Sequence, residues 1–184
     1  MNKTREKILI GKKRYDAELL WAEKKDRAKI KQLYNHWLKL KVGLKNFESR
    51  SPNLPEGISE SAFSLEFGCP RVLDVQGSSG SFDCYNPKTH KRIQIKATTI
   101  RYDLTSFGPD SVWDVIYLLD FYRDGKFDGK YDVYKIPNAL IYNHKINKTQ
   151  TFRDQQAQGR RPRFSIKKSI IAPNKIKPVK TCTI

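Results

Sequence analysis

Apolar and polar residues alternate on both sides of a turn at 87–89, within the segment 81–96. Successive side chains of a β-strand point to opposite faces, so this period of two predicts a β-hairpin. Pairing across the turn brings Asp83 level with Gln94 and leaves the apolar side chains on one face for the core. The other face then carries a carboxylate, an amide and, at Lys96, an ammonium group. Few surface hairpins need that combination.

These three polar groups suit a metal-assisted reaction on a phosphodiester. Such a reaction needs oxygen ligands for a hard cation and a positive group beside the attacking water. Asp83 and Gln94 offer the oxygens, and Lys96 offers the positive group. A solvent-facing strand lysine is the common alternative for Lys96, but its place beside Gln94 favours a functional role. Glu60, in the helix expected before the hairpin, is either a further ligand or an acidic residue of the first helical turn that interacts favourably with the helix dipole.

The charge balance points to an anionic polymer as the partner. The 184 residues include 36 Lys and Arg against 19 Asp and Glu, a net charge of +17, so nucleic acid is the first candidate and a membrane surface the second. The longest apolar runs, such as 115–119, are far too short to span a bilayer. No apolar segment with a cleavage site follows the basic N-terminus, so we expect the protein to stay in the cytoplasm.

The cysteines and the length indicate a single globular domain without covalent or zinc cross-links. Cys69, Cys84 and Cys182 are odd in number and lack metal-binding spacing, which argues against a disulfide framework or a zinc site. Cys69 and Cys84 are expected to be small buried residues. A chain of this length can bury a proper core as one compact domain.

The remaining pattern predicts both helices and strands. Apolar residues recur at helical spacing from Tyr15 to Leu40 among many lysines and arginines, which predicts one long or two shorter amphipathic helices. Each single lysine there suits a solvated face, and only their sum argues for phosphate contact. Further on we expect, in order, a connector at 51–55, a helix at 58–67 closed by Gly68, a strand at 71–76, a Gly/Ser link at 77–80, strands at 112–122 and 130–136, a helix starting within 137–143 and a basic, irregular tail at 155–180.

Asp83, the ten residues after it and the run Gln-Ile-Lys at 94–96 resemble the motif of the PD-(D/E)xK nucleases. Glu60 stands where that superfamily often has an additional acid. Two features depart from the motif, because Ser-Phe precedes Asp83 in place of the proline and Gln94 replaces the second carboxylate. An amide oxygen can still bind a cation, but the site loses one negative charge, which leaves the number of bound metal ions open.

A wider likeness accompanies the motif. The segments 54–60, 103–109, 113–114 and 159–164, together with the motif strands, resemble small type II restriction endonucleases of this superfamily, in particular those that cut interrupted GC-rich palindromes of the GCNGC type. The resemblance covers 54–166. It implies Mg²⁺-dependent cleavage of both strands of double-stranded DNA by a homodimer, leaving 5′-phosphates, in a bacterium that protects its own sites with a cognate DNA methyltransferase.

The resemblance also implies a fold. We expect an α/β protein with a restriction-endonuclease-like mixed five-stranded sheet flanked by helices. Outside the region of resemblance, the helical spacing and the many lysines and arginines predict that residues 1–50 form a basic helical N-terminal arm that contacts DNA. Residues 51–184 would form the nuclease core with a basic, DNA-contacting C-terminal segment, and the whole would be one compact domain.

The catalytic residues that the resemblance implies are Asp83, Gln94, Lys96 and Glu60. The metal ligands would be Asp83, Gln94, Glu60 and the carbonyl of Ile95. Lys96 would orient the attacking water and neutralise the charge that develops on the phosphate.

Two polar segments are expected to contact DNA through Arg160, Arg161, Arg163, Gln156, Thr105 and Ser106. The three guanidinium groups suit phosphate oxygens and, in bidentate geometry, the O6 and N7 atoms of guanine. A basic tail without a specific role is the alternative. The glutamine could add contacts to adenine or to the backbone, and the threonine and serine lie in a loop close in sequence to the catalytic strand.

Two other functions remain open at this point. A transposon-end nuclease or a Holliday-junction resolvase of the same superfamily accommodates a glutamine at position 94, and a resolvase would require a branched substrate. A non-catalytic nucleic-acid-binding protein would bind DNA through charge alone. Its binding would need no Mg²⁺ and would give Asp83 no role.

Overall fold

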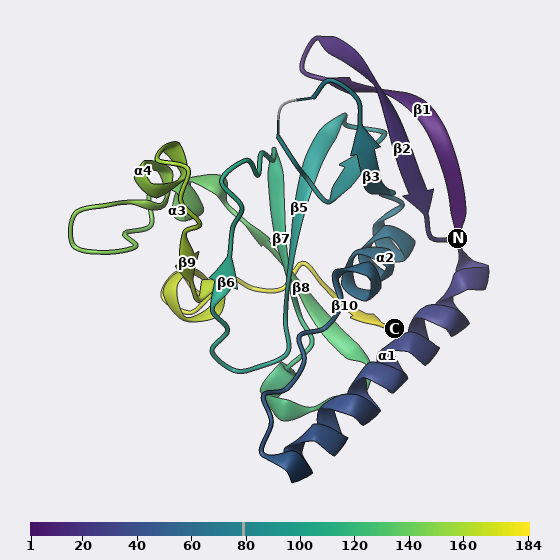
Figure 1. Cartoon of the computed structure of the whole chain (residues 1–184), viewed down its shortest axis with the longest axis vertical. Coiled ribbons are helices and arrows are strands. Elements are labelled where there is room, and N and C mark those ends of the chain that lie inside the picture. The colour runs from purple at the N-terminus through teal and green to yellow at the C-terminus, as the bar shows by residue number, and fades with distance from the viewer. Residues whose placement is uncertain (79) are drawn as a thin grey trace.

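The structure, a computed structural model, describes residues 1–78 and 80–184, so Ser79 of the predicted Gly/Ser link lies outside the described residues. At its centre is a mixed sheet of eight strands in the order β1-β2-β3-β4-β5-β7-β8-β10 (Figure 1). The strands are β1 (Asn2–Ile10), β2 (Lys13–Trp21), β3 (Arg71–Val75), β4 (Cys84–Asn86), β5 (Lys91–Thr98), β7 (Val115–Asp120), β8 (Lys130–Ile136) and β10 (Lys180–Thr183). β5 and β7 run parallel, whereas the other neighbouring strands run antiparallel.

Helices cover both faces of this sheet (Figure 1). α1 (Arg27–Gly43) and α2 (Glu56–Phe67) lie on one face, and α3 (Asn138–Tyr142), α4 (Phe152–Ala157) and a small sheet of β6 (Thr105–Ser106) and β9 (Arg163–Phe164) lie on the other. Short helical turns complete the chain at Lys24–Asp26, Leu44–Phe47, Arg123–Gly125 and Lys167–Ile171. β7 separates the two layers, because Leu119 packs with α1 and α2 whereas Ile116 and Leu118 pack with the other layer. A strand buried on both faces is typical of the centre of a sheet.

The N-terminal segment differs from the prediction. Residues 2–21 form the hairpin β1–β2, so the helix predicted from Tyr15 is wrong over β2 and right over α1. Ala17 and Leu19 of β2 are buried two residues apart, as a strand requires, and Gly11 at φ +62° lies in the turn. The predicted number of five strands is also wrong, because this hairpin and β10 extend the sheet to eight.

The C-terminal part is more ordered than predicted. The supposedly irregular tail at 155–180 contains the end of α4, β9 and a π-helical turn at Lys167–Ile171, and β10 then pairs with β8. Other predictions are confirmed: α2 ends at Phe67 and is closed by Gly68, which has φ +62°, and β8 has the predicted bounds. The hairpin joins the same sheet as the rest of the chain, and a division at residue 50 stays a prediction.

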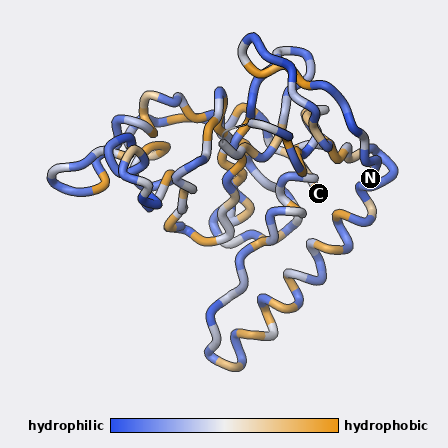
Figure 2. Tube along the Cα trace, turned by 45° about the horizontal axis from the view of Figure 1, so that its top comes forward, coloured by the Kyte–Doolittle hydropathy of each residue, from blue (hydrophilic) through white to orange (hydrophobic). Residues whose placement is uncertain are grey.

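Three further features concern the cysteines, the pattern of α1 and the length of the helices. All three cysteines are buried and free, which confirms the prediction for Cys69 and Cys84. Along α1, hydrophobic and hydrophilic residues alternate turn by turn (Figure 2), and Ile30, Tyr34 and Trp37 form its buried face. Within the described part of the chain, no helix is long and apolar enough to cross a membrane.

Candidate active site

The β4–β5 hairpin sets Asp83 opposite Gln94. Asp83 lies directly before β4, its backbone N–H donates to the carbonyl of Ile93 at 3.0 Å, and the neighbouring pair is Cys84 with Ile93. The turn is closed by Asn86, whose side-chain oxygen accepts hydrogen bonds from the two backbone N–H groups of residues 88 and 89 at 3.0 and 3.1 Å. Such an Asx turn is a local property of the sequence. The predicted register is therefore confirmed.

The amide of Gln94 is oriented by Asp83. Its Nε2 donates a hydrogen bond to Asp83 Oδ2, and the N–H of Ile95 donates to the same oxygen at 2.6 Å. Gln94 is only 3% exposed, and its Oε1 has no hydrogen-bond partner in the described structure. A buried acceptor left without a partner costs about 1–3 kcal/mol. This oxygen therefore fits a ligand that binds to it during function.

Glu60 reaches the same site from α2. The helix begins at Glu56, so Glu60 lies in the second turn and not, as predicted, in the first. Its side chain is mostly buried and accepts a hydrogen bond from Arg71 Nε at 2.8 Å. Burial, followed by the charge of Asp83, raises the pKa of Glu60 to about 7, while the hydrogen bond from Arg71 opposes this rise.

The second carboxylate of the site is perturbed in the same direction. Burial raises the pKa of Asp83 to about 6, and the charge of Lys96 and the hydrogen bond from Ile95 oppose the rise. Two neighbouring carboxyl groups with raised pKa values, next to an unpaired amide oxygen, are typical of a functional site. Such a buried polar group destabilises the fold, so a purely structural role would not favour it.

The donor set fits a hard divalent cation. Two carboxylates and an amide oxygen are the oxygen ligands that Mg²⁺ and similar ions prefer. Within residues 1–78 and 80–184, no group of three or more His, Cys, Asp and Glu side chains is arranged to hold a metal ion. A cation bound by Asp83 and Glu60 would therefore draw its third side-chain oxygen from Gln94.

Sequence reasoning missed two charged residues near this site, Glu56 and Arg71. The charge of Glu56 raises the pKa values of both Glu60 and Asp83, so it lies close to them. Its spacing of four residues from Glu60 puts both on one helical face, and this relation was recognisable once the helix start was placed correctly. Nothing in the sequence pattern points to Arg71.

Lys96 connects the catalytic hairpin with the opposite layer. Its Nζ lies 5.1 Å from the centre of the Phe107 ring, which follows β6, and its charge acts on Asp83. It makes no ion pair with any residue that the structure describes. The ammonium group is thus held by an aromatic ring near the two carboxylates and keeps its hydrogen-bond donors for another partner.

The two segments expected to contact DNA come together as the small sheet of β6 and β9. Thr105 pairs with Phe164 and Ser106 pairs with Arg163, although the segments are far apart in the sequence. Thr105 is buried, whereas Ser106 is half-buried and Arg163 is exposed. Phe107, after β6, lies under Lys96, so this small sheet adjoins the catalytic residues.

The other expected contact residues differ in their surroundings. Arg160 and Arg161 are exposed and make no ion pair within the described residues. Gln156 Nε2 donates to the carbonyl of Ser111 at 2.9 Å, so its amide supports the loop before β7. The geometry leaves the arginines available for a partner and engages the glutamine in the fold.

Comparison with known proteins shows the family of the chain. The family model described as Bsp6I restriction endonuclease matches residues 22–173. The chain belongs to the Bsp6I restriction endonuclease family. A relative, the type II restriction enzyme Bsp6I of Bacillus sp. (strain RFL6), is 39% identical over 149 residues, which cover 79% of this chain and 81% of the relative. No solved structure matches.

The family match has a structural boundary. It begins at Ala22, directly after β2, so the hairpin β1–β2 lies outside the region that the Bsp6I family model covers. It includes α1, the candidate ligands, Lys96 and the arginine cluster at 160–163. As a member of the Bsp6I family, the protein is a restriction endonuclease, an enzyme that cuts DNA at a specific sequence.

Proposed function

We propose that this protein works as a type II restriction endonuclease that cuts both strands of duplex DNA with Mg²⁺, as a homodimer, and leaves 5′-phosphates. One observation carries the metal dependence: the buried Oε1 of Gln94, without a hydrogen-bond partner in the described structure, beside the carboxylates of Asp83 and Glu60. The hairpin with the motif and the helix with the additional acid support assigning the sheet to the restriction-endonuclease-like fold.

The side chains of the site have two roles, which are metal binding and stabilisation of negative charge. Asp83, Glu60, Gln94 and the carbonyl of Ile95 would hold Mg²⁺. When bound, Mg²⁺ supplies polarisation of the scissile phosphate and a lower pKa for the attacking water. The Lys96 ammonium, free of ion pairs among the described residues and held over Phe107, donates to the attacking water or to a phosphate oxygen and stabilises the negative charge that develops there.

DNA would lie against the small sheet next to the catalytic residues. Arg163 is exposed on β9, and Arg160 and Arg161 are exposed just before it. These guanidinium groups suit both phosphate oxygens and guanine edges. Ser106, paired with Arg163, is placed for a backbone contact, and Thr105 and Gln156 support the loops that carry these residues.

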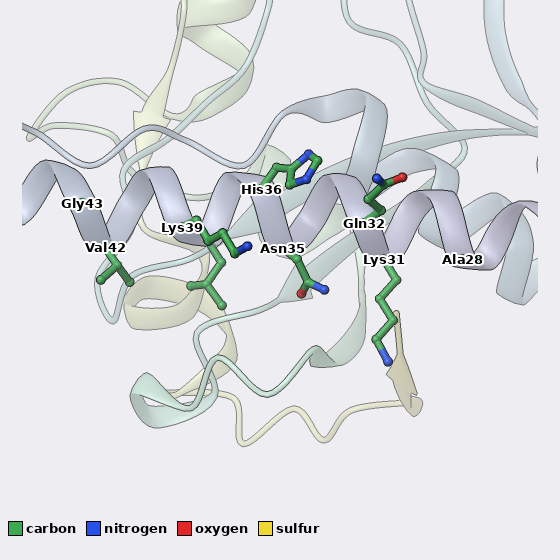
Figure 3. A pocket seen from close by; sticks show the side chains of 9 residues that line it. Ala28, Lys31, Gln32, Asn35, His36, Lys39, Val42 and Gly43 are labelled. Carbon is green, nitrogen blue, oxygen red and sulfur yellow. The ribbon is translucent and has the colours of Figure 1, made fainter.

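The outer face of α1 is a second DNA-binding surface. From Arg27 to Phe47 the chain has no acidic residue, and four lysines are exposed there (Lys29, Lys31, Lys39 and Lys45). Arg27 pairs instead with Glu66 of α2, and Lys41 is buried. An open groove of about 820 Å³ runs along the helix (Figure 3). It is lined by side chains that can donate hydrogen bonds, namely Lys31, Gln32, Asn35, His36 and Lys39, and by apolar side chains that include Ala28, Leu38 and Val42. Phosphate oxygens, which only accept, complement such a surface.

The same charges argue against a dimer interface at α1. A two-fold symmetric interface brings one surface against itself, and here it would bring together two faces that carry only basic charges. Since a restriction endonuclease acts on DNA, the phosphate backbone is the better partner for this face. α1 lies at the outer edge of the molecule (Figure 1), so the contact would be made to DNA that flanks the cleaved sequence.

A digestion experiment tests the proposed function. The purified protein is incubated with unmethylated phage DNA in Mg²⁺ or in EDTA, and the fragment ends are sequenced. We expect discrete fragments with 5′-phosphates in Mg²⁺ only, and protection when a cognate DNA methyltransferase of the bacterial host has modified the DNA. Cleavage in EDTA, or of branched DNA alone, would contradict the proposal.

A further inference from the structure

Arg71 joins the two elements that carry the candidate metal ligands. It is the first residue of β3 and the only residue of that strand with a register partner in β4, namely Cys84, which follows Asp83. The backbone N–H of Val72 donates to the carbonyl of Asp83 at 2.9 Å, and that of Tyr85 donates to the carbonyl of Pro70 at 3.0 Å. The main chain on both sides of Arg71 is therefore fixed against the segment that contains Asp83.

The side chain of Arg71 extends from this strand to α2. Its Nε donates to Glu60 Oε2 at 2.8 Å, and the two side chains are 17% and 11% exposed, respectively. Its Nη1 lies over the first turn of α2, since a Cβ atom added to Gly57 would lie 3.8 Å from it. The guanidinium thus spans the start of α2 and the Glu60 carboxylate from a strand that is bonded to Asp83.

The position of Glu60 needs such a support. Two partly desolvated carboxylates repel each other, and a flexible glutamate on a helix can turn away from an aspartate whose backbone is fixed in a sheet. The bond to Arg71 engages Oε2 of Glu60 and leaves Oε1, which accepts no hydrogen bond from the described residues. An outer partner of this kind fixes the orientation of a ligand before the metal arrives.

We propose that Arg71 is a positioning residue of the nuclease site: it holds Glu60 beside Asp83 so that both carboxylates bind one divalent cation. This inference rests on the proposed function, in which both acids are metal ligands. In this role Arg71 acts through its hydrogen bond to Glu60 and is not itself a metal ligand. Its loss therefore weakens metal binding and leaves the chemical step at saturating metal nearly intact.

The variants Arg71→Met and Arg71→Lys test this role, with Arg27→Met as the matched control. Arg27 Nη2 donates to Glu66 Oε1 at 2.5 Å on the same helix α2, away from the site, so the control breaks another Arg–Glu pair of that helix, together with a hydrogen bond to the carbonyl of Thr183. Mn²⁺ binding to the DNA-free protein is measured by calorimetry. In parallel, the Mg²⁺ concentration for half-maximal cleavage and kcat at saturating Mg²⁺ are measured.

We expect Arg71→Met to weaken Mn²⁺ binding and to raise the half-maximal Mg²⁺ concentration about tenfold or more, as loss of an outer partner of a metal ligand does. Its kcat at saturating Mg²⁺ should stay within about threefold of wild type, and Arg71→Lys, which keeps the charge and one donor, should lie between the two proteins. Arg27→Met should lower only the melting temperature.

Two results would overturn the inference. Unchanged Mn²⁺ affinity in whichever Arg71 variant keeps the wild-type circular dichroism spectrum would show that Arg71 serves the fold alone. A wild-type protein that binds no Mn²⁺ and cuts no DNA in Mg²⁺ would overturn the proposed function, and this inference with it. The first result leaves the proposed function standing, so the two failures are distinguishable.

Discussion

Gln94 and Asp83 face each other next to the β4–β5 pair, and the amide Nε2 donates a hydrogen bond to the carboxylate Oδ2. The N–H of Ile95 donates to the same oxygen. Among the described residues, Asp83 Oδ1 and Gln94 Oε1 accept no hydrogen bond. The amide therefore orients its neighbour with one end and offers a ligand oxygen with the other, which a glutamate in its place could not do.

Gln94→Glu tests this double role. A glutamate cannot donate to Asp83 and places a second buried carboxylate against it, so we expect the metal-free variant to melt at a lower temperature than wild type. Mg²⁺ should raise its melting temperature more than that of wild type, and cleavage should be retained at saturating Mg²⁺. Thermal melts in EDTA and in Mg²⁺, together with cleavage assays, decide this.

Two outcomes would contradict that prediction. An unchanged metal-free melting temperature would mean that the hydrogen bond from Gln94 to Asp83 contributes nothing to stability. Complete inactivity with Mg²⁺ still bound would mean that the amide of Gln94 contacts the substrate and not the metal.

Asp83→Ala and Lys96→Ala should each abolish cleavage, because they remove a metal ligand and the cation that serves the attacking water. Neither residue belongs to the apolar core, so circular dichroism and DNA affinity in Ca²⁺ should stay close to wild type. Lys135→Ala, at an exposed strand position of β8, is the matched control and should cut normally. Activity near wild type in either site variant would show that the catalytic residues lie elsewhere.

The active-site hairpin was predictable because its determinants are local. The turn at Asn86 and the alternation on both sides fix the register of Asp83 and Gln94 within a dozen residues. The contact between Arg71 and Glu60 was not predictable, because it depends on how α2 packs against β3. This packing cannot be inferred from the spacing of residues in the sequence. The same holds for the pairing of β6 with β9, which joins segments far apart in the chain.

The N-terminal hairpin shows how two periods can compete. Between Tyr15 and Ala22 the apolar residues satisfy a helical spacing and also alternate as a strand. Tertiary packing decides between them, because Leu19 is buried in one cluster with Tyr85 of β4 and with Phe82, which precedes that strand. Short apolar runs of this kind fit either structure. The following helix, α1, is longer, and its buried residues Ile30, Tyr34 and Trp37 recur at helical spacing, so its period was unambiguous.

The raised pKa values of Glu60 and Asp83, about 7 and about 6, predict a pH dependence. Their ordinary values are 4.5 and 3.8, so between these and the raised values the folded, metal-free protein holds more protons than the unfolded chain. Its stability therefore falls as the pH rises through this window. Mg²⁺ competes with those protons, and the Mg²⁺ concentration for half-maximal cleavage should fall over the same range.

Glu60→Gln isolates the contribution of one carboxyl group. Its metal-free melting temperature should decline less than that of wild type as the pH rises from 4.5 to about 7, and it should need more Mg²⁺ for half-maximal cleavage. Thermal melts in EDTA across this range provide the measurement. If both proteins show the same decline and the same Mg²⁺ requirement, Glu60 neither titrates there nor binds the metal.

The outer face of α1 predicts a dependence on DNA length. If Lys31 and Lys39 contact phosphates that flank the target, wild type should bind a long duplex more tightly than a short one with the same target. The double variant Lys31→Glu and Lys39→Glu should lose that gain, lower the salt slope by about two units and still cut the short duplex. The control is the double variant Lys12→Glu and Lys148→Glu, which has the same net charge. If both double variants lost this gain in affinity equally, net charge alone would explain it.

The arginine cluster predicts separate roles in recognition. Arg160, Arg161 and Arg163 are exposed beside the catalytic layer, and at least one of them should contact guanine while the others bind phosphates. Alanine at the guanine-contacting residue should cost about 1–3 kcal/mol of specific binding and narrow the difference between cognate and random duplexes. Alanine at a phosphate-binding residue should weaken both complexes equally and lower the salt slope by about one unit.

Salt titrations separate these roles when each single alanine variant binds cognate and scrambled duplexes. A lost base contact changes the ratio of the two affinities. A lost phosphate contact changes both affinities together. Lys168→Ala, at an exposed position just beyond β9, serves as the control for loss of one charge. Should all three arginine variants lower both affinities equally, the cluster binds phosphates only. Base recognition would then come from another surface, of which the loop at 103–110 is the nearest in sequence to the catalytic strand.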